Sequence, residues 1–361
     1  MGKYKICVYA IAKNEEKFVD RWMDAVGEAD SVVVLDTGST DHTAEKLRAR
    51  GANVYVEQIT PWRFDTARNK AMDHIPKDVD ICVSNDMDEV FEKGWREKLE
   101  AAWKPGYTRA RYLFTYAYRE DGTPEKQFAM EKIHRRNDFR WVHPVHEILE
   151  YSGKDGDQTV FVPGLVLNHH PDPSKSRSQY LPLLELSVQE NPNDDRAVFW
   201  LGREYMYNDR LDECIRTLQR HLKMPTATWE EERSASMRFI AECYQRKNDF
   251  GQAKAWLFRA IGECPYVREP YLQMARLGYS RNDWPLVYFA TERGLKITQK
   301  TGSYLLEPQS WGFLLDDYAA IACFWLGLPQ KALEHAQKAL DFQPEDERLK
   351  NNLQIIRQKE E

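Results

Sequence analysis

The chain has 361 residues, of which 42% are hydrophobic, and this composition fits a packed globular protein with room for two domains. Its formal net charge of −6 gives no general attraction for a polyanion, so nucleic acid is not an expected partner. The six cysteines are dispersed without a Cys-x-x-Cys pair, which indicates reduced core thiols and a cytoplasmic location. The apolar stretch from Ile6 to Ala12 is too short for a membrane span and lacks a cleavage site, so neither a span nor an export signal is expected.

Up to about residue 170, short apolar runs alternate with amphipathic stretches, the pattern of strand-helix-strand units in an α/β fold with a mainly parallel sheet. The predicted strands cover residues 5–10, 31–35, 53–56 and 80–84, and the predicted helices cover residues 15–26, 41–50, 65–74 and 93–103. Three β-rich segments follow, over residues 109–118, 126–135 and 159–167.

Polar residues follow three of the predicted strands, where ligands of open α/β sheets collect. They are Asn14 with Glu15, Asp36, and the pair Asp86 and Asp88. Two carboxylates released from a strand into a turn are suited to a hard cation such as Mg²⁺ or Mn²⁺ and to the phosphates that it binds. Alone, the Asp-Met-Asp triplet also fits a solvated acidic turn.

Beyond Asp172 the chain is predicted to be helical, and small residues recur at fixed spacing. Ala253, Ala260 and Pro265 are separated by seven and five residues, and the spacing returns at Ala332, Ala339 and Pro344. This resembles the tetratricopeptide repeat, a helix-turn-helix unit of roughly 34 residues; a generic helical bundle is the alternative. The predicted organisation is a sheet domain over residues 1–171, a linker helix over residues 172–193 and an all-α repeat domain over residues 194–361.

Four segments in the first half resemble the family 2 glycosyltransferases, in the right order and at fitting separations. They are Ala10-Ile11-Ala12-Lys13-Asn14-Glu15-Glu16, the stretch from Val33 to Asp41, Phe64-Asp65-Thr66-Ala67-Arg68-Asn69, and Asn85-Asp86-Met87-Asp88-Glu89. The resemblance covers about residues 4 to 170. It is strongest to a bacterial and phage branch with a tetratricopeptide domain, which includes peptide glycosyltransferases that modify bacteriocins.

The resemblance implies a GT-A fold and a nucleotide-diphosphate sugar donor, most often a uridine one. By residue match, the segment from Ala12 through Asn14 to Glu15 and the carboxylate of Asp36 would hold the nucleoside. Arg68 and Asn69 would border the donor pocket, Asp86 would lie near ribose and metal, and Asp88 would bind the metal. Structural alternatives remain: Asp36 and Asp41 can cap the helix from residue 41, Asn14 can cap the helix from residue 15, and Arg68 can lie on a solvated helix face.

The segment from Trp141 to Glu147 resembles the His-Glu segment of this branch, which would make Glu147 the general base of an inverting transfer. The alternative is a surface strand residue paired with Arg135 or Arg136. His169 resembles the late histidine that completes many GT-A metal sites, with His170 as runner-up. A zinc site made of His143, His146 and His169 is a further alternative.

Together these features predict a metal-dependent, inverting glycosyltransferase of the hexosyltransferase class that uses Mn²⁺ or Mg²⁺ and a UDP-sugar. The acceptor is left open among peptides, glycans, lipid-linked sugars and modified nucleobases. The repeats are expected to present a surface for the acceptor or for a second copy of the chain. The rival interpretation is a helical-repeat adaptor whose sheet domain binds a nucleotide without turnover. A nucleotidyltransferase is disfavoured, since the sequence has no glycine-rich phosphate loop.

Overall fold

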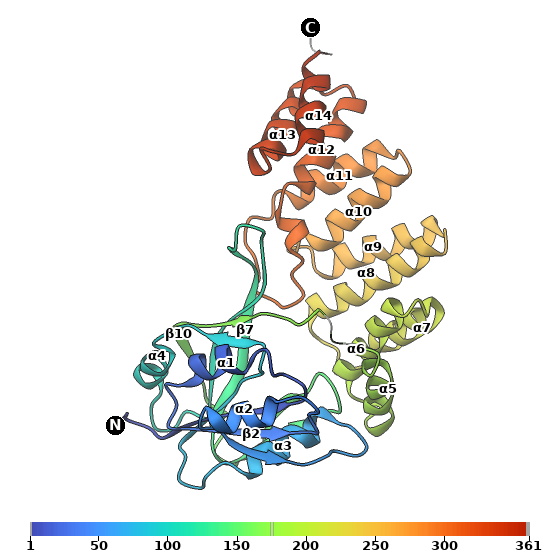
Figure 1. The fold of residues 1–361 in the computed structure, drawn as a ribbon. Coiled ribbons are helices and arrows are strands. Elements are labelled where there is room, and N and C mark those ends of the chain that lie inside the picture. The colour runs from blue at the N-terminus through green and yellow to red at the C-terminus, as the bar shows by residue number, and fades with distance from the viewer. Residues whose placement is uncertain (1, 174, 176, 359–361) are drawn as a thin grey trace. The chain divides into compact units, whose positions relative to one another are not determined.

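The computed structural model describes residues 2–173, 175 and 177–358 (Figure 1). The chain divides into two compact units, with the division between Ser187 and Val188. The first unit contains the β-sheets and the second is helical. No helix in the described part of the chain is long and apolar enough to cross a bilayer. The domain limits inferred from the sequence stay a prediction.

An eight-stranded sheet in the order β3-β2-β1-β4-β7-β6-β10-β5 forms the centre of the first unit. Its strands are β1 (Ile6–Ala12), β2 (Ser31–Asp36), β3 (Asn53–Val56), β4 (Ile81–Ser84), β5 (Glu89–Phe91), β6 (Arg109–Tyr118), β7 (Pro124–Arg135) and β10 (Thr159–His169). The flanking helices are α1 (Val19–Val26), α2 (Thr43–Ala49), α3 (Phe64–Asp73) and α4 (Trp95–Ala102), and α5 (Tyr180–Glu190) follows the sheet. The block from β3 to β4 is parallel, as predicted, whereas β7 is antiparallel to both its neighbours.

Both faces of the parallel block are covered, which explains the continuous apolar runs in the sequence. Along β1, Ile6 and Val8 face one hydrophobic core, while Cys7 and Tyr9 face a second core on the opposite side. Because successive side chains alternate between faces, a strand buried on both sides needs apolar residues throughout.

Parallel register aligns the carboxyl ends of the central strands. Ala12 pairs with Asp36 across β1 and β2, and Tyr9 pairs with Ser84 across β1 and β4. The residues that follow β1, β2 and β4 therefore leave the same edge of the sheet, as the sequence predicted.

Three short strands were not predicted. One is β5, which pairs antiparallel with β10. The others, β8 (Phe139–Val142) and β9 (Ile148–Tyr151), form a separate two-stranded sheet. The predicted helix from residue 15 also begins later, at Val19, because Asn14 has a positive φ of 56° and a turn occupies the next residues.

Antiparallel helix pairs build the second unit: α6 (Asp195–Tyr207) with α7 (Leu211–His221), α8 (Glu230–Arg246) with α9 (Phe250–Glu263), α10 (Glu269–Ser280) with α11 (Trp284–Gly294), and α12 (Leu314–Trp325) with α13 (Pro329–Phe342). A 3₁₀ turn (Pro308–Trp311) precedes α12, and α14 (Glu347–Gln358) follows the last pair. Figure 1 shows these pairs succeeding one another along the chain.

The recurring small residues lie where paired helices touch. Ala253 and Ala260 of α9 are fully buried, and a Cβ on Gly202 of α6 would come within 2.4 Å of Leu218 Cδ2 of α7. Pro265 and Pro344 come just after α9 and α13 end. The predicted architecture of helical repeats is confirmed, and close helix approach is the physical reason for the spacing.

Candidate active site

The carboxylate of Asp36 lies at the end of β2 and is 1% exposed. Its Oδ1 accepts hydrogen bonds from the backbone N–H groups of Gly38 at 3.0 Å and Ser39 at 2.8 Å. Its Oδ2 is buried and has no hydrogen-bond partner among the described residues. A buried carboxylate oxygen without a donor is costly, so this atom is suited to an N–H or O–H group of a ligand.

Glu15 presents a second buried carboxylate at the end of β1. One oxygen, Oε1, pairs with Lys175, while Oε2 is buried without a hydrogen-bond partner in the described chain. Burial raises the pKa of Glu15, and Lys175 opposes that shift. Glu15 and Asp36 thus each keep one acceptor oxygen unused.

Asn14 and Ala12 connect the loop that follows β1 to the loop that follows β2. Asn14 Oδ1 accepts from the N–H of Thr40 at 2.8 Å, and the Asn14 N–H donates to Ser39 Oγ at 2.9 Å. The Ala12 carbonyl accepts from the N–H of Thr37 at 2.8 Å. Asn14 does not cap a helix from residue 15, because its amide oxygen is engaged with Thr40.

Asp41 lies one residue before His42, the N-cap residue of α2. Its Oδ1 accepts from the N–H of Thr43, the first residue of α2, at 3.0 Å. Asp36 instead accepts from the N–H groups of Gly38 and Ser39, which precede α2, so it does not cap that helix.

Asp86 follows β4 and belongs to a dense charge network. Arg68 donates to it twice, from Nη1 to Oδ1 at 2.7 Å and from Nη2 to Oδ2 at 3.1 Å, and Lys132 Nζ donates to Oδ2 at 2.9 Å. Lys132 also pairs with Glu89 at 2.8 Å. Burial disfavours charge on Asp86, yet Arg68 and Lys132 outweigh it and hold the pKa of Asp86 well below its ordinary value.

Arg68 links this network to Glu147. Arg68 lies on α3 and is 5% exposed, and its Nε donates to Glu147 Oε1 at 2.5 Å. Its guanidinium also lies over the ring of Trp141, 5.0 Å from the centroid. Arg68 is therefore not on a solvated helix face, and the partner of Glu147 is Arg68, not Arg135 or Arg136.

Asn69, the next residue of α3, has a different task. Its Nδ2 donates to the carbonyl of Trp141 and its Oδ1 accepts from the N–H of Trp141, each at 2.8 Å. Both ends of the amide are engaged with one residue of β8. Asn69 thereby anchors the segment that leads to Glu147.

Asp88 and His169 lie close together, with Asp88 Oδ2 3.5 Å from His169 Nε2. The pairing of β10 with β5 brings them together, since His169 lies opposite Glu89 in the register. His170 instead stacks on Tyr118, with ring centroids 5.7 Å apart. His169 is thus placed beside the predicted metal-binding carboxylate.

Neither predicted set of three metal ligands is assembled as a compact group. Among the described residues, the one group of three His, Cys, Asp or Glu side chains whose ligand atoms lie within 4.8 Å of one another is in the helical unit. Asp86 is held by Arg68 and Lys132 instead of joining Asp88 and His169 at that distance, and His146 packs against Tyr180.

Three residues of this edge were not singled out from the sequence. Lys132 and Lys175 supply positive charge to Asp86 and Glu15, and Asn85 is fully buried without a hydrogen bond to either side-chain amide atom in the described chain. Asn85 directly follows the buried strand β4 and directly precedes Asp86, and this position could have marked it as a site residue. No local pattern marks the two lysines.

One histidine of β7 belongs to the core of the first unit. His134 is completely buried, and its Nε2 lies 2.9 Å from the hydroxyl of Tyr9. Burial lowers the pKa of His134 to about 4.

Comparison with known proteins gives a family match within the first unit. The family model described as glycosyl transferase family 2 matches residues 7–153. No curated protein matched the chain.

Several solved structures are similar to part of the chain. The structure of pilF from Pseudomonas aeruginosa is 11% identical and covers 49% of this chain and 72% of that one, with a TM-score of 0.38. MamA is 16% identical over 45% of this chain and 86% of that one, with a TM-score of 0.37. YrrB, described as a TPR protein with an unusual peptide-binding site, is 15% identical over 47% and 79%, with a TM-score of 0.34.

The four ordered motifs, the sheet topology and the family match agree. Residues 7–153 match the glycosyl transferase family 2 model, and the second unit is built of successive helix pairs.

Proposed function

We propose that the protein is a metal-dependent, inverting glycosyltransferase that moves a sugar from a uridine diphosphate donor to a hydroxyl or thiol acceptor on a peptide or glycan. The glycosyl transferase family 2 domain supports the reaction class. The observation that carries the donor assignment is the unpartnered Oδ2 of Asp36, buried at the carboxyl edge of the sheet. Within this proposal the helical unit presents the acceptor or a second copy of the chain.

The nucleoside is assigned to Asp36 and Glu15. Uracil carries an imide N–H and ribose carries hydroxyls, and both are donors that a carboxylate oxygen accepts. Asp36 and Glu15 each have one buried oxygen without a donor. A nucleoside would supply the missing donors and so offset the free-energy cost of burying these acceptor oxygens without a hydrogen bond.

The residues present fit a divalent cation in part. Asp88 Oδ2 and His169 Nε2 are 3.5 Å apart, a separation at which one ion can bind both, and carboxylate with imidazole suits Mn²⁺. Asp86 would join them only by exchanging its contacts with Arg68 or Lys132. A cation bound there supplies Lewis-acid stabilisation of the charge on the departing diphosphate.

Glu147 is assigned as the general base. Its Oε1 accepts from Arg68, and its second oxygen is assigned to the proton of the acceptor. Arg68 fixes the orientation of the carboxylate, while Asn69 fixes the backbone before it through Trp141. A positioned base of this kind aligns the attacking atom with the anomeric carbon.

The test is a thermal-shift panel of the full chain with UDP-sugars, ADP and GDP, each with and without Mn²⁺. Uridine compounds should give the largest rise in melting temperature, because a ligand stabilises the native state by mass action. Asp88→Ala should remove the Mn²⁺ dependence. Equal shifts from the uridine, adenosine and guanosine compounds would overturn the donor assignment. If the chain binds UDP-sugars tightly but neither transfers nor slowly hydrolyses the sugar in an activity assay, the non-catalytic adaptor is favoured.

A further inference from the structure

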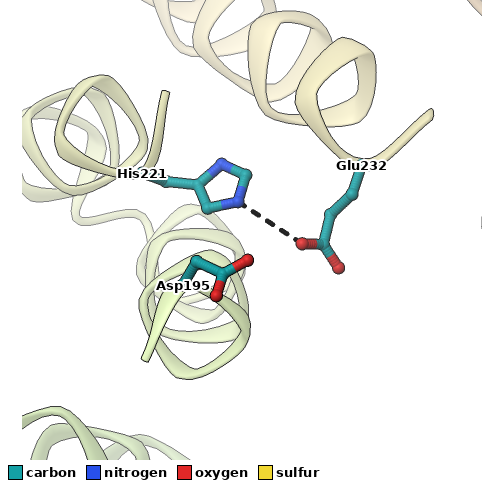
Figure 2. Close-up of side chains that lie close together, drawn as sticks. All are labelled: Asp195, His221 and Glu232. Atoms are coloured by element: carbon teal, nitrogen blue, oxygen red, sulfur yellow. Dashed lines mark ion pairs between the residues drawn. The ribbon is translucent and has the colours of Figure 1, made fainter. Parts of the chain in front are cut away.

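Three side chains converge at the ends of three helices in the helical unit, and none of them belongs to a motif described above. Asp195 begins α6, His221 ends α7 and Glu232 lies in the first turn of α8. Their ligand atoms all lie within 4.8 Å of one another. Figure 2 shows both carboxylates beside the imidazole of His221.

His221 is buried and incompletely satisfied. The residue is 0% exposed, and its Nε2 lies 3.3 Å from Glu232 Oε1 without the geometry of a hydrogen bond. Buried ring nitrogens are normally hydrogen-bonded. Nε2 therefore lies at ion-pair distance from Glu232, and it makes no hydrogen bond within the described residues.

The other ring nitrogen of His221, Nδ1, has a hydrogen-bond partner on α8. Nδ1 lies 2.9 Å from the hydroxyl of Ser236, which is fully buried on α8. When Nδ1–H donates to Ser236 Oγ, Nε2 carries its lone pair toward Asp195 and Glu232. Histidines that bind metals are oriented in this way by a partner on the second nitrogen.

Glu232 is oriented in the same manner. Its Oε2 accepts from the hydroxyl of Tyr304 at 3.0 Å, which leaves Oε1 facing His221. Tyr304 is itself fixed by stacking on Trp200, with ring centroids 5.7 Å apart. Two of the three side chains are therefore held in place by contacts outside the cluster.

We propose that Asp195, His221 and Glu232 bind a divalent transition-metal ion, with zinc as the best match, that ties together the ends of α6, α7 and α8. One imidazole nitrogen with two carboxylate oxygens suits Zn²⁺ better than Mg²⁺ or Ca²⁺, which prefer oxygen alone. Ligand atoms sit about 2 Å from zinc, so side chains already within 4.8 Å of one another have little distance to close. Water completes the coordination.

A second histidine with two carboxylates provides a matched control. His335 has Asp316 2.8 Å from Nδ1 and Glu292 3.5 Å from Nε2. The carboxylates are on opposite ring nitrogens, so one nitrogen cannot share an ion with both. The same composition without convergence should not bind zinc.

The experiment uses the full chain carrying Asp88→Ala, which removes a ligand proposed for the catalytic metal. After chelator treatment and dialysis against Zn²⁺, bound zinc per chain and melting temperature are measured. We expect one bound zinc and a rise in melting temperature, and no comparable rise with Mg²⁺. Adding Asp195→Asn or His221→Gln should weaken zinc binding at least about tenfold, whereas adding His335→Gln should leave it unchanged.

Three results would overturn the site: no zinc bound to the Asp88→Ala chain, equal loss in the His335→Gln control, or a melting-temperature rise with Mg²⁺ as large as that with Zn²⁺. Undiminished binding in Asp195→Asn would overturn it as well. Circular dichroism verifies that each variant is folded. If His221→Gln fails to fold, Asp195→Asn decides alone, because Asp195 is only partly buried. None of these outcomes depends on a nucleotide, so they do not bear on the proposed transferase reaction.

Discussion

Arg68 Nε donates to Glu147 Oε1 at 2.5 Å, although the two residues are 79 positions apart in the chain. The same guanidinium holds Asp86 through both terminal nitrogens. The proposed base and the carboxylate proposed to lie near ribose and metal therefore share one buried cation. A donor or metal that engages Asp86 must compete with Arg68, and any release of Arg68 also changes the surroundings of Glu147.

Arg68→Ala should lower the free energy of unfolding by about 3–5 kcal/mol, because removing one partner of a buried ion pair leaves the other uncompensated. Urea denaturation of the variant measures this change. Arg50→Ala is the control, since Arg50 pairs with Asp20 and Asp24 at the surface, where solvent screens the charges. A loss no larger than that of the control would mean that Arg68 does not compensate buried charge.

Asp36→Asn should retain the fold and weaken binding of uridine nucleotides. The amide oxygen can still accept from the N–H groups of Gly38 and Ser39, but the other atom becomes an NH₂ donor where Oδ2 had been an unused acceptor. Losing this acceptor should cost about 1–3 kcal/mol of binding free energy. Isothermal titration calorimetry with UDP measures the effect, and Asp41→Asn serves as a folded control. Unchanged affinity in Asp36→Asn would remove Asp36 from the nucleoside site.

The sequence predicted the elements that local patterning determines. The limits of β3 and β6 agree with the structure, because their apolar and polar residues follow strand periodicity between clear turns. The short strands β8 and β9 were missed, since four residues give little periodic signal and their pairing depends on a partner outside the main sheet.

The sequence indicated which polar residues follow the strands at this edge of the sheet, but it did not indicate how their side chains are connected. Asp36 and Glu15 were placed by the ends of β2 and β1, yet the unpartnered oxygens that distinguish them are a property of the folded loops. Lys132 approaches Asp86 only because β7 runs antiparallel to β4. The cluster around His221 is likewise invisible in the sequence, because the packing of α6, α7 and α8 brings its members together.

Glu147→Gln should lower kcat by about 10²–10⁴-fold, because an amide cannot accept the acceptor's proton. Nucleotide binding should change far less than kcat, since Glu147 is assigned to the acceptor side and reaches Asp86 only through Arg68. Steady-state kinetics with a UDP-sugar and a transferable acceptor, combined with calorimetry, separates the two effects. Glu150→Gln is the matched control, because Glu150 is an exposed residue of β9. Full activity in Glu147→Gln would assign the base to another residue.

His134 should make the protein less stable as the pH falls from about 6.5 to about 4. Burial lowers the pKa of the folded-state imidazole to about 4, whereas the unfolded chain takes up the proton near the ordinary value of 6.5. The unfolded state then binds more protons than the native state across this window, so the free energy of unfolding should drop with a slope approaching about 1.4 kcal/mol per pH unit. Urea denaturation at stepped pH values measures the slope. His134→Gln should lose this component while His74→Gln, whose ring stacks on the exposed Tyr55, should keep it; equal slopes in the two variants would contradict the assignment.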